Sequence, residues 1–230
     1  GLAKDTRLVL LPVDAEGYYP AHPETTNTGT WSSIRCLSED GTKLYYWNVN
    51  GAYSGDSTHL VALDLATRTH STPVTSAGIT HYARVADNGA GQILSLGNAN
   101  SGGAWLAKFI DTSTGAVTSV TVSGDSIPSS KGIYGLAWCA DQGYWISVWL
   151  DSDKVYGWSS GPSTTGAVIV ATITKTGSNT ATASIRTITT GDGVPTNHRA
   201  YQGVFYDPTY GCLIWCGHPE YVAKAIKVGT

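Results

Sequence analysis

The sequence of 230 residues carries 14 Lys and Arg against 17 Asp and Glu, which gives a net charge of −3 and a pI near 6.0. This balance gives no basic footprint for a nucleic acid or an anionic membrane surface, so we expect neither partner. Hydrophobic residues make up 41% of the chain and charged residues 13%, which excludes an intrinsically disordered chain. No run of about 18 apolar residues occurs, so we also expect no insertion into a membrane.

One short alanine-bearing strand recurs four times along the chain. Its copies span residues 60–64, 106–111, 170–174 and 222–227. Two strands joined by a glycine turn precede each copy, and a strand rich in Thr, Val or Ser follows the first three. The fourth copy is not followed by such a strand, but residues 7–14 at the other terminus have the right composition for it. We therefore expect a ring of sheets that closes on itself.

The first hairpin of each repeat carries an acidic or polar residue before a glycine. These glycines are Gly41, Gly89, Gly143 and Gly211, at intervals of 48, 54 and 68 residues. The remaining 60 residues join Gly211 to Gly41 through the two termini, so the four intervals account for the whole chain. Because nothing is left for a second unit, we predict a single domain over residues 1–230.

The repeats predict four short antiparallel strands each. In the first repeat we expect strands at residues 31–37, 43–48, 59–65 and 68–75, and in the third at 134–139, 144–150, 167–174 and 183–189. Repeats of about 40 to 50 residues built in this way are typical of propeller blades. The pattern resembles the β-propeller repeat superfamily, with kelch-like and WD-like proteins nearest in layout.

This resemblance implies an all-β fold, a β-propeller of four blades with four antiparallel strands each. The N-terminal strand at residues 7–14 would pair with the C-terminal blade and close the ring, which removes an unpaired edge that favours aggregation. A propeller of five blades is the alternative. In that case residues 155–158 would form the first strand of the additional blade.

The four cysteines are expected to be buried apolar fillers rather than reactive or metal-binding groups. Cys212 and Cys216 lie four residues apart on one strand, about 13 Å from each other, which is too far for a disulfide. A bridge between Cys139 and Cys212 from adjacent blades is the alternative. Because no Cys-x-x-Cys or paired Cys/His spacing occurs, we predict no metal and no other cofactor.

Function is expected at the end of the ring where the connections are long, because binding residues concentrate on loops held by a rigid scaffold. Antiparallel pairing places the tight glycine turns at one end and the longer, aromatic and polar connections at the other. Aromatic rings pack against sugar C–H faces, and His, Gln and Asn side chains bond to hydroxyl groups. The candidate ligand-binding residues are Trp31, Tyr53, His81, Tyr134, Tyr156, Trp158, His198, Tyr201, Gln202 and His218.

These features favour a non-catalytic binding or structural module that recognises a glycan or a protein surface. A lectin-like protein and a surface or receptor-binding part of a phage-type virion both fit, so we expect an extracellular or virion-surface location, with a cytoplasmic one left open. The alternative is a small carbohydrate-active enzyme that uses two carboxylates. Its candidate acids are Glu16, Glu24, Asp56, Asp125, Asp151, Asp153 and Asp192. We assign no catalytic residue and no oligomeric state.

Overall fold

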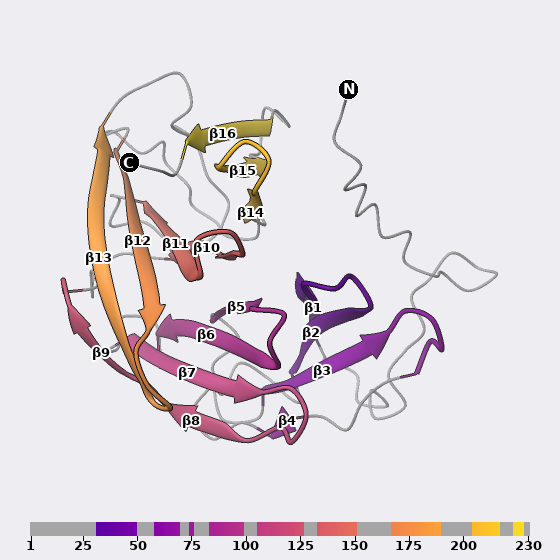
Figure 1. Cartoon of the computed structure of the whole chain (residues 1–230). Helices are drawn as coiled ribbons and strands as arrows, with labels where there is room; N and C mark the ends of the chain where they lie inside the picture. The colour runs from indigo at the N-terminus through magenta and orange to yellow at the C-terminus, as the bar shows by residue number, and fades with distance from the viewer. Residues whose placement is uncertain are drawn as a thin grey trace.

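The computed structural model describes residues 31–49, 58–69, 74–75, 83–98, 105–126, 133–150, 167–189, 204–216 and 223–227. All the regular structure in these residues is β-strand, arranged in four sheets that follow one another along the chain (Figure 1). The all-β prediction is therefore confirmed.

The first two sheets each contain four strands in sequence order. Sheet 1 consists of β1 (Trp31–Leu37), β2 (Lys43–Val49), β3 (Thr58–Asp64) and β4 (Val74–Thr75). Sheet 2 consists of β5 (Arg84–Asp87), β6 (Gln92–Asn98), β7 (Trp105–Asp111) and β8 (Val117–Ser119). Neighbouring strands are antiparallel throughout these two sheets.

The third and fourth sheets depart from this count of strands. Sheet 3 consists of β10 (Ile133–Cys139), β11 (Tyr144–Leu150), β12 (Ala167–Lys175), β13 (Thr180–Thr189) and β9 (Thr121–Gly124). Sheet 4 consists of β14 (Val204–Asp207), β15 (Cys212–Cys216) and β16 (Ala223–Lys227). In sheet 3 the fifth strand, β9, comes from the segment that directly follows β8 and pairs in parallel with β13.

The first strand of each sheet is the innermost strand of the ring. β5 contacts both β1 and β10, and β10 contacts β14, so these strands lie around a common centre (Figure 1). Among the described residues no comparable contact joins β14 to β1, and these strands do not close the ring. The arrangement is that of a β-propeller.

The position of a strand in its sheet explains its pattern of burial. The inner strand β11 is apolar almost throughout, and its residues from Trp145 to Trp149 are all buried because neighbouring sheets cover both of its faces. The outer strand β13 alternates instead. Ala181 and Ala183 are buried while Thr182 and Ser184 are exposed, which is typical of a strand with one face toward solvent.

Apolar side chains fill the spaces between successive sheets. Leu60 and Val85 belong to the cluster between sheets 1 and 2, and Phe109 and Trp145 belong to the cluster between sheets 2 and 3. A further cluster around Ile146 and Leu213 joins sheets 3 and 4. The sheets are therefore held face to face by hydrophobic packing, as blades are.

The expected strands in the first and third repeats agree with the structure to within a few residues, except for the last strand of the first repeat and the start of β13. The sequence did not reveal β9 as part of sheet 3. The proposed closing strand at residues 7–14 and the start of a fifth blade at residues 155–158 both lie outside the described residues. The number of blades in the whole ring therefore stays a prediction.

Candidate functional site

Strand direction separates the two ends of the sheets. The hairpins that join the first strand of each sheet to the second, and the third to the fourth, lie at one end, which we call the turn end. There Gly41 and Gly143 adopt φ angles of 72° and 71°, which explains why glycine occupies both turns. At the opposite end, the loop end, β2, β6, β11 and β15 finish and β3, β7, β12 and β16 begin.

The predicted ligand-binding residues belong to strand starts at the loop end or to the connections between strands. Trp31 is the first residue of β1, where it pairs with Val49, and Tyr134 is the second residue of β10. Both backbone positions lie at the loop end. The other eight candidates lie in connections outside the described residues: Tyr53, His81, Tyr156, Trp158, His198, Tyr201, Gln202 and His218. Their predicted role in binding stays a prediction.

Carboxylates at the turn end are used to shape the turns. Oδ1 of Asp111 accepts hydrogen bonds from the backbone N–H and hydroxyl of Ser113, at 2.9 and 2.6 Å, and from both equivalent groups of Thr114. These bonds, led by that of the Ser113 hydroxyl, lower the pKa of Asp111 to about 2. Asp64 makes the same kind of contacts with Thr67 in sheet 1. These carboxylates accept hydrogen bonds that stabilise the turns, and we assign them no catalytic role.

A buried polar contact joins sheets 1 and 2 near the turn end. Oδ2 of Asp87 accepts the backbone N–H of Glu39 at 3.0 Å, while Oδ1 of Asp87 is buried without a hydrogen-bond partner among the described residues. Burial, and then the nearby charge of Asp87, raise the pKa of the thiol of Cys36 and that of the hydroxyl of Tyr45. This group of side chains joins two sheets and was not singled out from the sequence.

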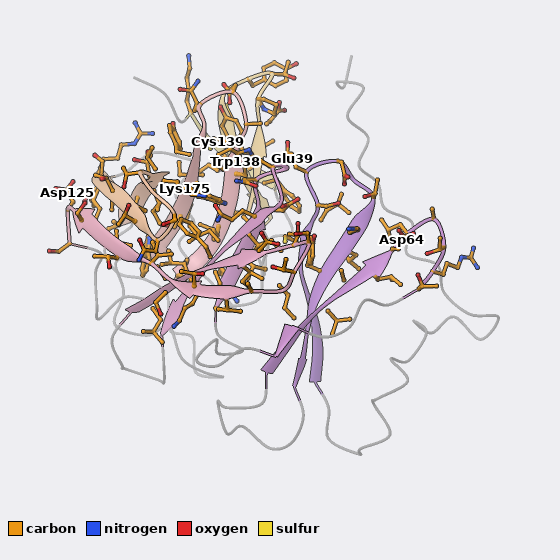
Figure 2. The ribbon with its side chains drawn as sticks, turned by 60° about the horizontal axis from the view of Figure 1, so that its bottom comes forward. Glu39, Asp64, Asp125, Trp138, Cys139 and Lys175 are labelled. Carbon is orange, nitrogen blue, oxygen red and sulfur yellow. The ribbon has the colours of Figure 1, made fainter. Side chains whose placement is uncertain are left out.

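Sheets 2 and 3 are joined by an aromatic row. Nε1 of Trp145 donates a buried hydrogen bond of 3.0 Å to the carbonyl oxygen of Ala86, and the ring of Trp145 lies 5.6 Å from that of Phe109. On its other side Trp145 contacts the partly exposed Trp138 at a centroid distance of 4.7 Å. Nζ of Lys175 lies 5.3 Å from the centre of the Phe109 ring. In Figure 2 the labels of Glu39, Trp138 and Cys139 lie close to one another in the upper part of the view.

The interface between sheets 3 and 4 also contains polar groups. Burial, and then the neighbouring carboxylate of Asp141, raise the pKa of Tyr206. The Tyr206 hydroxyl is buried, and no hydrogen bond of good geometry reaches it within the described part of the chain. At the same interface Cys139 is fully buried among apolar side chains, as expected for a filler.

The three cysteines whose side chains the structure describes do not pair. Cys36, Cys139 and Cys212 carry free thiols, so the alternative bridge between Cys139 and Cys212 is wrong. No group of three or more His, Cys, Asp or Glu side chains among the described residues is arranged to hold a metal ion. Nor do these residues include a helix long and apolar enough to cross a bilayer.

Of the candidate acids for the alternative enzymatic function, the structure describes Asp125. Asp125 directly follows β9, and its Oδ2 accepts the backbone N–H of Ile185 at 2.8 Å. It lies at the periphery of the molecule, on the outer strands of sheet 3, where the connection from β9 to β10 begins (Figure 2). Its carboxylate is engaged in strand pairing. The other six candidate acids lie outside the described residues.

Two large hydrophobic side chains are exposed in sheet 4. Phe205 on β14 is 63% exposed and Tyr210 in the following turn is 62% exposed. Val204 and Tyr206 point toward sheet 3, so alternation along the strand turns Phe205 to the opposite face. This alternation can be read from the sequence once β14 is assigned, although neither residue was predicted as a site.

Comparison with known proteins gives structural similarity alone. No protein-family model matches the sequence, and no curated protein matches it. The chain is similar to hydrazine synthase from Kuenenia stuttgartiensis, with 10% identity over 83% of this chain and 51% of that chain, at a TM-score of 0.49. It is also similar to TolB from Acinetobacter baumannii, with 14% identity over 87% of this chain and 44% of that chain, at a TM-score of 0.46.

A third similar structure is the β-propeller domain of the Trilobed protease from Pyrococcus furiosus. It has 10% identity over 87% of this chain and 69% of that chain, at a TM-score of 0.38. The chain thus spans about half of the hydrazine synthase chain and less than half of the TolB chain.

Proposed function

We propose that the chain is a non-catalytic binding or structural module whose loop end recognises a glycan or a protein surface. The observation that supports this proposal is the direction of the strands. Every strand end that flanks a connection with a candidate residue lies at the loop end, whereas the turn end carries short hairpins whose polar groups are bonded within the protein. Rigid sheets would therefore hold all ten candidates at one end of the ring.

The chemistry of the candidates favours a glycan as the ligand. Six are aromatic rings, Trp31, Tyr53, Tyr134, Tyr156, Trp158 and Tyr201, and the other four are His or Gln. Aromatic faces cover the apolar side of a pyranose, while imidazole and amide groups donate to and accept from its hydroxyl groups. An uncharged sugar suits this set because none of the ten side chains carries a permanent charge.

A glycan array read beside turnover assays on the same sugars tests the proposal. We expect saturable binding without product, and loss of about fivefold or more in affinity for Tyr156→Ala and Trp158→Ala, because stacked rings contribute about 1 kcal/mol or more. Tyr210→Ala is the matched control, since Tyr210 is exposed at the turn end. An equal loss of affinity in Tyr210→Ala would contradict the placement of the binding site at the loop end. Product formation abolished by Asp151→Asn or Asp153→Asn would instead support the enzymatic alternative.

We also propose that residues 7–14 complete sheet 4 and close the ring. Sheets 1 to 3 each have a strand beyond the third one, whereas β16 has no outer neighbour among the described residues. β1 begins at the loop end, so a preceding strand that runs from the turn end to the loop end would be antiparallel to β16. The connection over residues 15–30 would then resemble in length the one between β13 and β14, which covers residues 190–203.

Deletion of the segment tests this closure. Removal of residues 1–14 should speed amide exchange at Ala225 and Lys227 of β16 and lower the melting temperature, because an edge strand loses its partner. Removal of residues 1–6 alone is the control and should change neither quantity. Native exchange rates in the longer deletion would show that the segment lies elsewhere.

A further inference from the structure

The backbone passes from one sheet to another between two consecutive residues. The N–H of Val120 donates to the carbonyl of Ala107 in sheet 2 at 2.9 Å, and the N–H of Thr121 donates to the carbonyl of Asn179 in sheet 3, also at 2.9 Å. β8 and β9 are thus one extended segment that serves two sheets. In Figure 1 this segment lies along the outside of the molecule, with β8 beside β7 and β9 beside β13.

The backbone N–H and the side-chain carboxylate of Asp125 both hold the end of β9 on β13. The N–H of Asp125 donates to the carbonyl of Ala183 at 3.0 Å, and its carboxylate accepts the N–H of Ile185 at 2.8 Å. The carboxylate takes the place that a backbone carbonyl would have if the strand continued. Ser123 adds a weaker bond of 3.3 Å from its hydroxyl to the carbonyl of Ala181.

Side-chain burial contributes little to this attachment. Thr121, Ser123 and Gly124 are exposed, and in the extended segment only Val120 and Val122 pack against the cluster between sheets 2 and 3. Gly124 has a φ of 84°, and a Cβ atom there would collide with the carbonyl oxygen of Ala183. β9 is therefore held by a few backbone bonds that depend on a glycine and an aspartate.

We propose that β9 is a clasp that couples sheets 2 and 3 into one cooperative unit and that opens locally without unfolding either sheet. A four-residue parallel strand with exposed side chains belongs to the least stable part of a fold. While it is closed, sheets 2 and 3 cannot move apart without breaking its bonds. Sheets 1 and 2 share no strand among the described residues.

A pair of glycine substitutions tests whether the clasp opens by itself. Gly124→Ala introduces both an unfavourable φ and a collision with β13, whereas Gly143→Ala introduces an unfavourable φ of 71° with no atom within 4 Å. In Gly124→Ala we expect amide exchange at Thr121, Asp125 and Ile185 to rise by about tenfold or more, as expected for loss of bonds that include a charged acceptor. Amides of β6 in sheet 2 and of β11 in sheet 3 should keep their native rates. Gly143→Ala should leave the three clasp amides unchanged.

An engineered disulfide between β9 and β13 should hold the clasp closed, in a chain that keeps both Gly124 and Gly143. The hydroxyl oxygens of Ser123 and Thr182 lie 3.2 Å apart on paired positions of β9 and β13. Neighbouring strands are about 4.8 Å apart, within the range that a disulfide spans. In Ser123→Cys/Thr182→Cys we expect exchange at the clasp amides to slow by about tenfold or more on oxidation and to recover on reduction. Mass spectrometry would verify the new bridge.

Two results would overturn the proposal. One is native exchange at the three amides in Gly124→Ala, or a rise of the same size in β6 and β11, which would indicate unfolding of sheets 2 and 3 instead of local opening. The other is exchange at the clasp amides that does not respond to oxidation of the verified disulfide. If Gly124→Ala fails to fold, the disulfide comparison alone decides.

Discussion

The indole of Trp145 in sheet 3 donates a buried hydrogen bond of 3.0 Å to the carbonyl oxygen of Ala86 in sheet 2. Trp145 is 1% exposed and Ala86 is 4% exposed, so neither group can turn to water. The bond therefore fixes the two sheets relative to each other at the turn end. It shows that the sheets are joined by specific polar contacts as well as by apolar packing.

Replacement of Trp145 by Phe should destabilise the fold by about 1 to 3 kcal/mol. The change removes a buried hydrogen bond between two sheets and leaves part of the volume of the indole unfilled, and both losses destabilise a buried site. Urea unfolding followed by circular dichroism measures the effect. Trp138→Phe is the control, because Trp138 is partly exposed and contacts the same neighbour. Equal stability of the two variants would contradict the role of the bond.

Gly135→Ala should destabilise the interface between sheets 3 and 4 by about 1 to 3 kcal/mol through overpacking. A Cβ at Gly135 on β10 would collide with the side chain of Val204 on β14. Val204→Ala removes Cγ2, the nearest colliding atom, and keeps Cβ, so it relieves part of the collision and the double variant should be more stable than the sum of the two single effects predicts. Unfolding free energies of all four proteins give the coupling. Strictly additive changes in unfolding free energy would show that Gly135 and Val204 are not in contact.

Ala171→Leu should cost about 1 to 3 kcal/mol, since Ala171 is fully buried in the cluster between sheets 2 and 3. Ala140→Leu is the control, because Ala140 lies exposed in a turn. Thermal unfolding of both proteins measures the difference. An unchanged melting temperature in Ala171→Leu would show that the alanine-bearing strand does not face a neighbouring sheet.

Acid should weaken the turns that Asp111 shapes. Because hydrogen bonds lower the pKa of Asp111 to about 2, its contribution is complete above the unfolded pKa of about 4 and is lost as the pH falls toward 2. Ser113→Ala removes the strongest donor and should raise this pKa toward its ordinary value. Carboxyl titration by NMR checks both statements. A native midpoint near 4 would contradict the bonding of Asp111.

Much of the fold could be predicted from local sequence pattern. The bounds of β1 agree with the expected strand because a glycine turn at Gly41 fixes one end of the hairpin. β11 was found through its continuous run of aromatic and aliphatic residues. These signals are local, so they do not depend on how the sheets are arranged.

The features missed depend on contacts between sheets. β9 reads as a continuation of β8, and nothing in the residues Thr121–Gly124 indicates that they leave sheet 2 for sheet 3. Because the pairing of β9 with β13 cannot be read from the sequence, the bond between the carboxylate of Asp125 and the backbone of β13 could not be predicted either. The contact of Asp87 with Glu39 likewise requires the two sheets to be adjacent. Sequence pattern identifies strands better than it identifies their neighbours.

The most direct test of the account is a hydrogen-exchange footprint of the protein with and without a sugar selected on the glycan array. We expect protection in the connections at residues 50–57, 76–82, 151–166, 190–203 and 217–222, which carry eight of the ten candidate residues. We expect no change in the turns at residues 38–42, 88–91, 140–143 and 208–211. Protection confined to those turns would contradict the assignment of the loop end as the recognition surface.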